Sequence, residues 1–253
     1  MVPYVEIPSL QIWGPIVVHP FGFLVVTGCI VGAMVARWHA KSIGLDVQRF
    51  SALIGWVLIS GLLVSHFITL LFYHPEQLRF DWKLLDVGKG MSSFGGFFGG
   101  ALGTLVYLRL YRLPILPFVD ALVLGLVVGW FFGRLGCTVA HDHPGLPSSF
   151  FLAVAYPTGP RHDLGFYEWL FTIGLNILLF TIRSRGCSVG ILTGVTCVIY
   201  CPVRFLLDFL REGDKLYFGF TPGQYFSLVL MIIGGVVLIR AIRQRKRTLR
   251  LEP

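Results

Sequence analysis

The feature that most constrains this chain is a series of seven apolar stretches, each long enough to cross a bilayer as a helix. A transmembrane helix needs about 20 predominantly apolar residues, because it rises about 1.5 Å per residue and the hydrocarbon core is about 30 Å thick. The stretches cover about residues 16–36, 51–73, 91–111, 115–135, 166–182, 188–210 and 224–243. They predict an all-α, polytopic membrane protein with seven transmembrane helices.

The composition agrees with this class. Of 253 residues, 55% are hydrophobic and only 13% are charged, whereas a soluble domain of this length would carry roughly twice that charge. No internal repeat is visible, and the longest break between apolar stretches covers residues 136–165. We therefore expect one integral-membrane domain over residues 1–253.

The Lys and Arg residues gather on one side of the predicted spans. They follow spans one, three, five and seven, at Arg37, Lys41, Arg49, Arg109, Arg112, Arg183 and Arg185 and in an arginine-rich tail over residues 240–253. Cytoplasmic loops carry such an excess, so we expect the C-terminus in the cytoplasm and the N-terminus outside. Because the basic tail adjoins a span, the net charge of +8 indicates anionic lipid as a partner, not nucleic acid.

Two arginines stand where a membrane helix accommodates them least readily. Arg134 closes the apolar run 125–132, and Arg204 lies inside the run 189–209. A cation held near hydrocarbon costs several kcal/mol unless it pairs or opens onto water, which makes both arginines functional-site residues by default. In the predicted topology both lie in the outer half of the membrane.

Arg204, Asp208 and Arg211 are spaced i, i+4 and i+7, which predicts one stripe along a helix. One interpretation is an internal ion pair that permits a buried arginine. The other is a cationic cradle for a lipid phosphate, in which Asp208 fixes the guanidinium of Arg204. A guanidinium suits that task because it is planar, can donate two hydrogen bonds to one phosphate at once, and stays protonated.

A glycine-rich segment opens the third span. Residues 90–100 contain five glycines, among them Gly95 and Gly96, and they also contain Ser92. Such a segment either provides a small-residue face for close helix packing or lets the backbone approach a ligand. Composition alone does not separate the two interpretations.

Three histidines in the 136–165 break and at its end are candidate proton acceptors. His141 and His143 flank an acid, and His162 precedes Tyr167 and Glu168 at the start of span five. Each of the three can act as a general base or belong to an orienting dyad. Tyr167 is also typical of an interfacial aromatic belt.

As a metal site, the pair His141 and His143 is incomplete. A third ligand would have to come from elsewhere in the fold, such as His162 or Asp163. The alternative for this segment is a solvated turn, because it ends in Pro-Gly. The five cysteines show no metal-binding spacing, and we expect them to be small buried hydrophobes.

These motifs, in this order and spacing, resemble the prolipoprotein diacylglyceryl transferase family. The matching segments are Gly133-Arg134-Leu135-Gly136, His162 with Tyr167-Glu168, the block 204–214, Thr221-Pro222-Gly223-Gln224, and Gly90-Met91-Ser92 with Gly95-Gly96. The resemblance covers nearly the whole chain. It implies a bacterial inner-membrane enzyme that moves the diacylglyceryl group of phosphatidylglycerol onto the lipobox cysteine of a prelipoprotein signal peptide, releasing glycerol phosphate. We expect no cofactor and no metal.

The resemblance also implies roles for individual residues. Arg134 and Arg204 would stabilise the lipid phosphate, and Asp208 would orient Arg204, because a phosphate leaving group needs cations as charge shifts onto it. Apolar spans would hold the acyl chains. The residues expected to line the site are Ser92, Gly95, Gly96, Tyr167, Glu168 and Arg211.

The sequence departs from the family pattern at the expected site. Phe94 stands where the family has a histidine, Phe21 where it has a tyrosine, Cys137 where it often has asparagine, and Asp208 where it commonly has glutamate. Either the proton-transfer role has moved to His141, His143 or His162, or the chain is a divergent relative that binds lipid or transfers another lipid-derived group. A small transporter lined by the buried charges is a third hypothesis.

Overall fold

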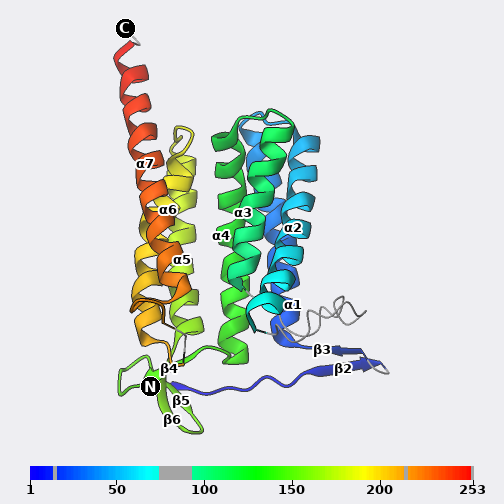
Figure 1. The fold of residues 1–253 in the computed structure, drawn as a ribbon, viewed down its shortest axis with the longest axis vertical. Coiled ribbons are helices and arrows are strands. Elements are labelled where there is room, and N and C mark those ends of the chain that lie inside the picture. The colour runs from blue at the N-terminus through cyan, green and yellow to red at the C-terminus, as the bar shows by residue number, and fades with distance from the viewer. Residues whose placement is uncertain (14–15, 74–92, 214–215, 252–253) are drawn as a thin grey trace. The chain divides into compact units, whose positions relative to one another are not determined.

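The computed structural model describes residues 1–13, 16–73, 93–213 and 216–251, and in this part the chain is mostly helical (Figure 1). Its elements are β1 (Val2–Pro3), β2 (Leu10–Trp13), β3 (Ile16–Val18), α1 (Pro20–Ser42), α2 (Val47–Tyr73), α3 (Ser93–Leu110), α4 (Ile115–Ala140), β4 (Pro144–Pro147), β5 (Val154–Tyr156), β6 (Gly159–Asp163), α5 (Leu164–Ser184), α6 (Ile191–Leu207), the 3-10 turn η4 (Asp208–Leu210) and α7 (Pro222–Leu251).

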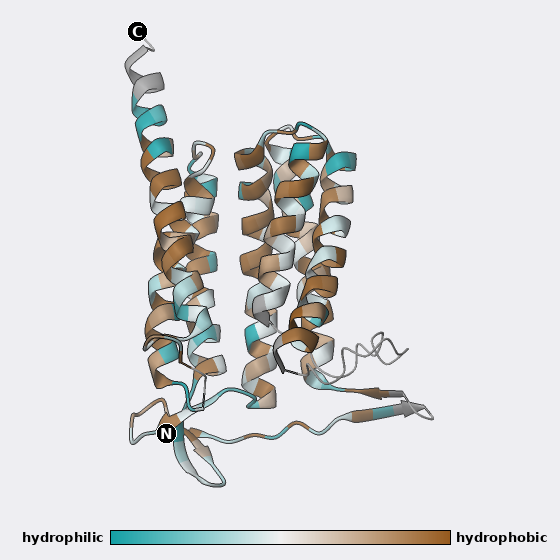
Figure 2. Cartoon of the chain, viewed as in Figure 1, coloured by the Kyte–Doolittle hydropathy of each residue, from teal (hydrophilic) through white to brown (hydrophobic). Residues whose placement is uncertain are grey.

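Within the described residues, six helices are long and apolar enough to cross a membrane, namely α1, α2, α4, α5, α6 extended by η4, and α7. Apolar residues dominate their lengths in Figure 2. The prediction of a polytopic helical membrane protein is thereby confirmed. The 18-residue helix α3 occupies the third predicted span, and its membrane crossing stays a prediction.

Helix boundaries differ from those expected at several places, including the start of α1 and the ends of α4 and α6. Helix α1 begins at Pro20, because residues 16–18 form the strand β3 that pairs with β2, and proline suits the first turn of a helix. Helix α4 continues to Ala140, five residues past the predicted end, so Arg134 lies inside the helix. Helix α6 ends at Leu207 and tightens into η4.

Contacts divide the chain into two compact units, residues 1–39 with 120–253 and residues 40–119. In the first unit, buried leucines of α4, α5 and α6 form the core, and α7 packs along α6. Its chemistry-bearing residues gather at one end, where α4 ends, α5 begins, α6 ends and α7 begins.

A four-stranded sheet, in the order β1-β5-β6-β4, joins α4 to α5 in this unit. Strands β5 and β6 form a hairpin closed by Tyr156 opposite Gly159, β4 pairs antiparallel with β6, and β1 pairs parallel with β5. The all-α prediction omitted these strands because each has only two to five residues, too few to show an alternation of polar and apolar residues. The sheet carries His162 and Asp163 and directly follows His141 and His143.

Asp120 joins α4 to the start of α6. Its buried carboxylate accepts hydrogen bonds from the backbone N–H of Gly190 at 2.5 Å and from the N–H and hydroxyl of Thr193 at 2.9 and 2.5 Å. The carboxylate therefore satisfies free amides at the N-terminus of α6 and complements its dipole.

We expect Asp120→Ala to lower the free energy of unfolding by about 2–3 kcal/mol, because buried amides lose a charged partner. Asp46→Ala is the matched control, since the half-exposed Asp46 caps α2 through Gln48 and Arg49 N–H; its loss should cost at most about 1 kcal/mol. Denaturant titration of both variants in detergent measures the difference. Equal losses would contradict the role assigned to Asp120.

In the second unit, residues 40–119, α3 packs closely along α2. A Cβ added to Gly95 would lie 2.8 Å from the Cα of Ser65, which is closer than a side chain tolerates. The glycine-rich segment thus serves close helix packing, the first of its two interpretations. Ser92 lies outside the described residues.

Candidate functional site

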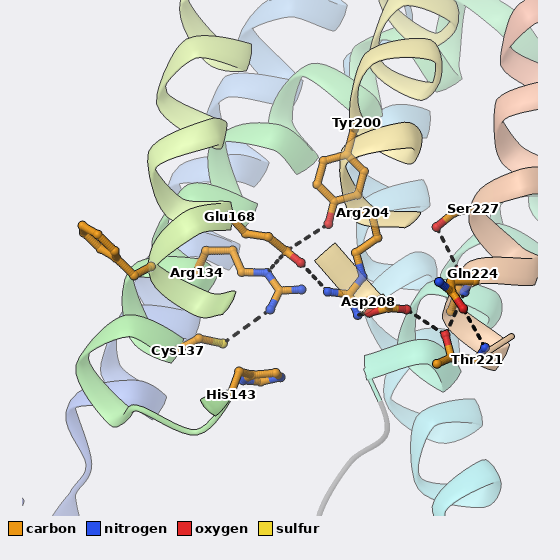
Figure 3. A network of polar contacts seen from close by, with 12 residues as sticks. Arg134, Cys137, His143, Glu168, Tyr200, Arg204, Asp208, Thr221, Gln224 and Ser227 are labelled. Carbon is orange, nitrogen blue, oxygen red and sulfur yellow. Dashed lines mark hydrogen bonds and ion pairs between the residues drawn. The ribbon is translucent and has the colours of Figure 1, made fainter. Parts of the chain in front are cut away.

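A fully buried carboxylate lies between the two membrane arginines (Figure 3). Glu168, in the first turns of α5, forms ion pairs with Nε of Arg134 from α4, at 2.5 Å, and with Nη1 of Arg204 from α6. The hydroxyl of Tyr200, one turn before Arg204, donates to the same carboxylate at 3.2 Å. Glu168 therefore ties three helices together at one point.

The cluster continues from Arg204 toward α7. Nη2 of Arg204 lies 2.7 Å from Oδ1 of Asp208, and Oδ2 of Asp208 accepts a hydrogen bond from the hydroxyl of Thr221 at 2.8 Å. Gln224 in turn accepts from the N–H of Thr221 and donates to the carbonyl of Phe205. Asp208 is thus held on both of its oxygens, and its contact with Arg204 is the one that the i, i+4 spacing predicted.

The charges of this cluster balance, with two guanidinium groups against two carboxylates. A buried ion needs such compensation, because its desolvation costs several kcal/mol. The guanidinium of Arg134 also lies 4.5 Å from the centre of the Trp130 ring, and its side chain is 9% exposed. Arg204 keeps 16% of its side chain exposed, and a pocket of about 250 Å³ opens beside Asp208 and Thr221.

Arg211 does not continue the predicted stripe. The chain leaves the α-helix at Asp208, and Arg211 has an extended backbone that forms a bridge with Gly145 of β4. The prediction of one helical stripe is therefore wrong at Arg211, because the 3-10 turn changes the helical phase after Leu207. Arg211 instead lines the pocket beside Asp208.

Two of the three histidines are bound to side chains outside the arginine cluster. Nδ1 of His141 lies 2.8 Å from Asp163, and its ring stacks on Tyr4. Nδ1 of His162 lies 2.9 Å from the hydroxyl of Tyr167. Burial lowers the pKa of His162 and so favours its neutral imidazole. Tyr167 therefore contacts a histidine in addition to any interfacial role.

His143 lies beside the arginine cluster (Figure 3). Its Nδ1 is hydrogen-bonded to Asp142. Donor atoms of His143, Asp142 and Cys137 lie within 4.8 Å of one another, and the thiol of Cys137 accepts from Nη1 of Arg134 at 3.8 Å. The structure thus connects His143 to Arg134 through a cysteine.

Sequence reasoning gave three members of this site too small a role. Tyr200 precedes Arg204 by four residues and Cys137 follows Arg134 by three, so helical spacing alone could have placed both beside the arginines. Glu168 was expected only to line the site. Its central position depends on how α5 packs on α4 and α6, which no local pattern encodes.

Comparison of the sequence with known proteins identifies its family. The sequence model of the prolipoprotein diacylglyceryl transferase family matches residues 8–240. The chain belongs to this family. The family resemblance predicted from the sequence motifs is thereby confirmed.

Several relatives carry the name phosphatidylglycerol–prolipoprotein diacylglyceryl transferase. One from a Wolbachia endosymbiont of Brugia malayi is 28% identical, over 95% of this chain and 97% of the relative. One from Chromohalobacter salexigens is 27% identical over 96% of each chain. One from Chlorobaculum tepidum is 32% identical over 62% of this chain and 57% of the relative.

Proposed function

We propose that this protein transfers the diacylglyceryl group of phosphatidylglycerol to the cysteine of a prolipoprotein. The observation that carries the proposal is the pair of arginines held on one buried carboxylate at the end of a helical membrane unit. Family membership and the names of the relatives support the same reaction.

Arg204 and Arg134 are the groups that we assign to the lipid phosphate. The reaction breaks the bond between the glyceryl carbon and a phosphate oxygen, and the electron pair of that bond goes to the phosphate. Fixed guanidinium groups stabilise this charge at little reorganisation cost, because Glu168 and Asp208 already hold them in place. The exposed edge of Arg204 and the adjacent pocket give the headgroup an approach to the cluster.

We assign the thiol side of the reaction to His143. A cysteine attacks as its thiolate, so a group near the phosphate site must promote loss of its proton. His143 adjoins the cysteine that contacts Arg134, whereas His141 and His162 are bound to Asp163 and Tyr167.

The proposed topology has seven transmembrane helices in the bacterial inner membrane, with the N-terminus outside and the C-terminus in the cytoplasm. The basic C-terminal part of α7 and the basic ends of α1, α3 and α5 support this orientation. The site then faces outward, on the side where a prelipoprotein signal peptide presents its lipobox cysteine.

Reconstitution tests the proposal directly. Purified protein in vesicles containing phosphatidylglycerol should add one diacylglyceryl mass to a lipobox peptide, and a peptide with serine in place of the cysteine should stay unmodified. Mass spectrometry of the peptide and detection of glycerol phosphate report both products. Unmodified peptide after reaction with folded protein would refute the proposed activity.

Alanine variants of the three histidines show which of them accepts the thiol proton. We expect His143→Ala to reduce the lipidation rate by about 100-fold or more, the scale of a lost acid–base group. His141→Ala and His162→Ala should retain most of the activity after correction for the fraction of folded protein. Unchanged rates in all three variants would show that no histidine of this group acts on the thiol.

A further inference from the structure

An apolar groove of about 260 Å³ lies between α6 and α7, next to the end of these helices that carries the arginine cluster. Residues from 201–206 of α6 and 227–231 of α7 line it, among them Pro202, Phe205 and Met231. Leu206, also in its wall, is 62% exposed. The groove therefore opens on the outside of the helix pair, where lipid surrounds a membrane protein.

The two helices touch closely on the side of the groove away from the cluster. A Cβ at Gly234 of α7 would lie 2.2 Å from the Cβ of Cys197, and one at Gly194 of α6 would lie 2.7 Å from that of Leu238. Small residues of this kind let helices approach until no space remains between them. The groove is therefore closed at its inner end.

A proline accounts for the separation of the helices beyond this contact. Pro202 lies inside α6 and lines the groove. A proline ring pushes against the preceding helical turn, and the helix bends away from the side that carries the ring. Because Pro202 faces the groove, α6 bends away from α7 at this level.

The other end of the groove reaches the arginine cluster. Phe205, which lines the groove, directly follows Arg204, and its carbonyl accepts a hydrogen bond from Gln224 at 3.2 Å. Gln224 also lines the polar pocket beside Asp208 (Figure 3). Between the same two helices, a cation and a polar pocket are thus followed directly by an apolar groove.

We propose that this groove binds one acyl chain of the phosphatidylglycerol donor while the phosphate of the same lipid lies at Arg204. This inference rests on the proposed function. An apolar groove beside a fixed cation fits an amphipathic ligand, because burial of methylene groups and pairing of the phosphate act on one molecule. With the site on the outer side of the membrane, the groove runs toward the bilayer centre, the direction in which the donor's chains extend. The bound chain then holds the glyceryl carbon beside the arginines.

The length of the groove determines which part of the chain it binds. Met231 lies about 10 Å along α7 from Gln224, at about 1.5 Å per residue, whereas half of the hydrocarbon core is about 15 Å thick. The groove therefore holds the part of the chain nearest the glycerol, and the remainder extends into lipid. A very short chain does not reach its inner end at Met231.

Photolabelling tests the groove independently of catalysis. Phosphatidylglycerol with a diazirine in one acyl chain is compared, in vesicles containing the full chain, with diacylglycerol that has the same chains and no phosphate. Adducts on Phe205, Leu228 and Met231 should be about fivefold or more enriched with phosphatidylglycerol, because only this lipid pairs with Arg204. Adducts on Ile232, which is 65% exposed, should be equal for both lipids. Equal labelling of the groove by both lipids would show that bulk lipid fills it and would overturn the inference.

Met231→Trp tests the role of chain length. The indole fills the inner end of the groove, so the ratio of kcat/KM for a dipalmitoyl donor to that for a dihexanoyl donor should fall about tenfold or more, because buried methylenes are lost. Ile232→Trp is the matched control on the adjacent exposed position, and its ratio should stay unchanged. An unchanged ratio in Met231→Trp, or an equal fall in both variants, would overturn the inference and leave the proposed function intact. Selective photolabelling by a protein that lipidates no peptide would overturn the proposed function, while the groove would stand as a lipid-binding site.

Discussion

Replacing Glu168 by glutamine should cause the largest loss of stability in this protein, about 3–5 kcal/mol of the free energy of unfolding. The amide keeps the shape of the side chain but removes the charge between Arg134 and Arg204. Asp208 then compensates Arg204 alone, and the uncompensated buried charge of Arg134 is strongly destabilising. Denaturant titration in detergent measures the loss.

Glu212→Gln is the matched control. Glu212 also forms an ion pair with an arginine, Arg161, but its side chain is 51% exposed, and exposed pairs contribute little because water screens them. Its replacement should leave unfolding unchanged within error. Equal stability of Glu168→Gln and the unaltered protein would contradict the central position of Glu168.

A double variant separates lost charge balance from lost packing. Adding Arg134→Met to Glu168→Gln restores the balance, because Arg204 and Asp208 remain as one pair. We expect the double variant to regain part of the lost stability. The double variant should lack lipidation activity, because one phosphate-binding arginine is missing.

Arg204→Lys should lower kcat/KM for lipidation at least 100-fold. Arg204 binds Glu168 with one terminal nitrogen and Asp208 with the other. A lysine ammonium keeps the charge, but it cannot contact both carboxylates and also bind two oxygens of one phosphate. A 100-fold loss corresponds to about 2.7 kcal/mol of transition-state stabilisation.

Lipidation rates measured at limiting and at saturating phosphatidylglycerol give kcat/KM and kcat for Arg204→Lys. Arg161→Lys is the control, since Arg161 binds Glu212 and the carbonyl of Gly145 outside the cluster, and its rate should stay near that of the unaltered protein. Arg204→Lys should also unfold less easily than Glu168→Gln, because it preserves the charge balance. Activity within twofold of normal would refute the role of the guanidinium fork.

Local pattern was sufficient for the helices and for one ion pair. Apolar length predicted the membrane helices, and the i, i+4 spacing predicted the contact of Arg204 with Asp208. The same rule failed at Arg211, because the helix changes to a 3-10 turn at Asp208. The strands were missed because each is short, and β1 pairs with β5 about 150 residues further along the sequence.

The sequence by itself determined that two arginines would be buried in membrane helices and that the chain belongs to the diacylglyceryl transferase family. Only the tertiary structure decided what compensates those charges. In the sequence, Glu168 is one acid among several, and the packing of α5 against α4 and α6 makes it the partner of both arginines. In the same way, Cys137 is a small apolar residue in the sequence, and the turn after α4 places His143 beside it. The reason is physical: helical spacing fixes neighbours within one helix, whereas the partner of a buried charge is chosen by packing between helices.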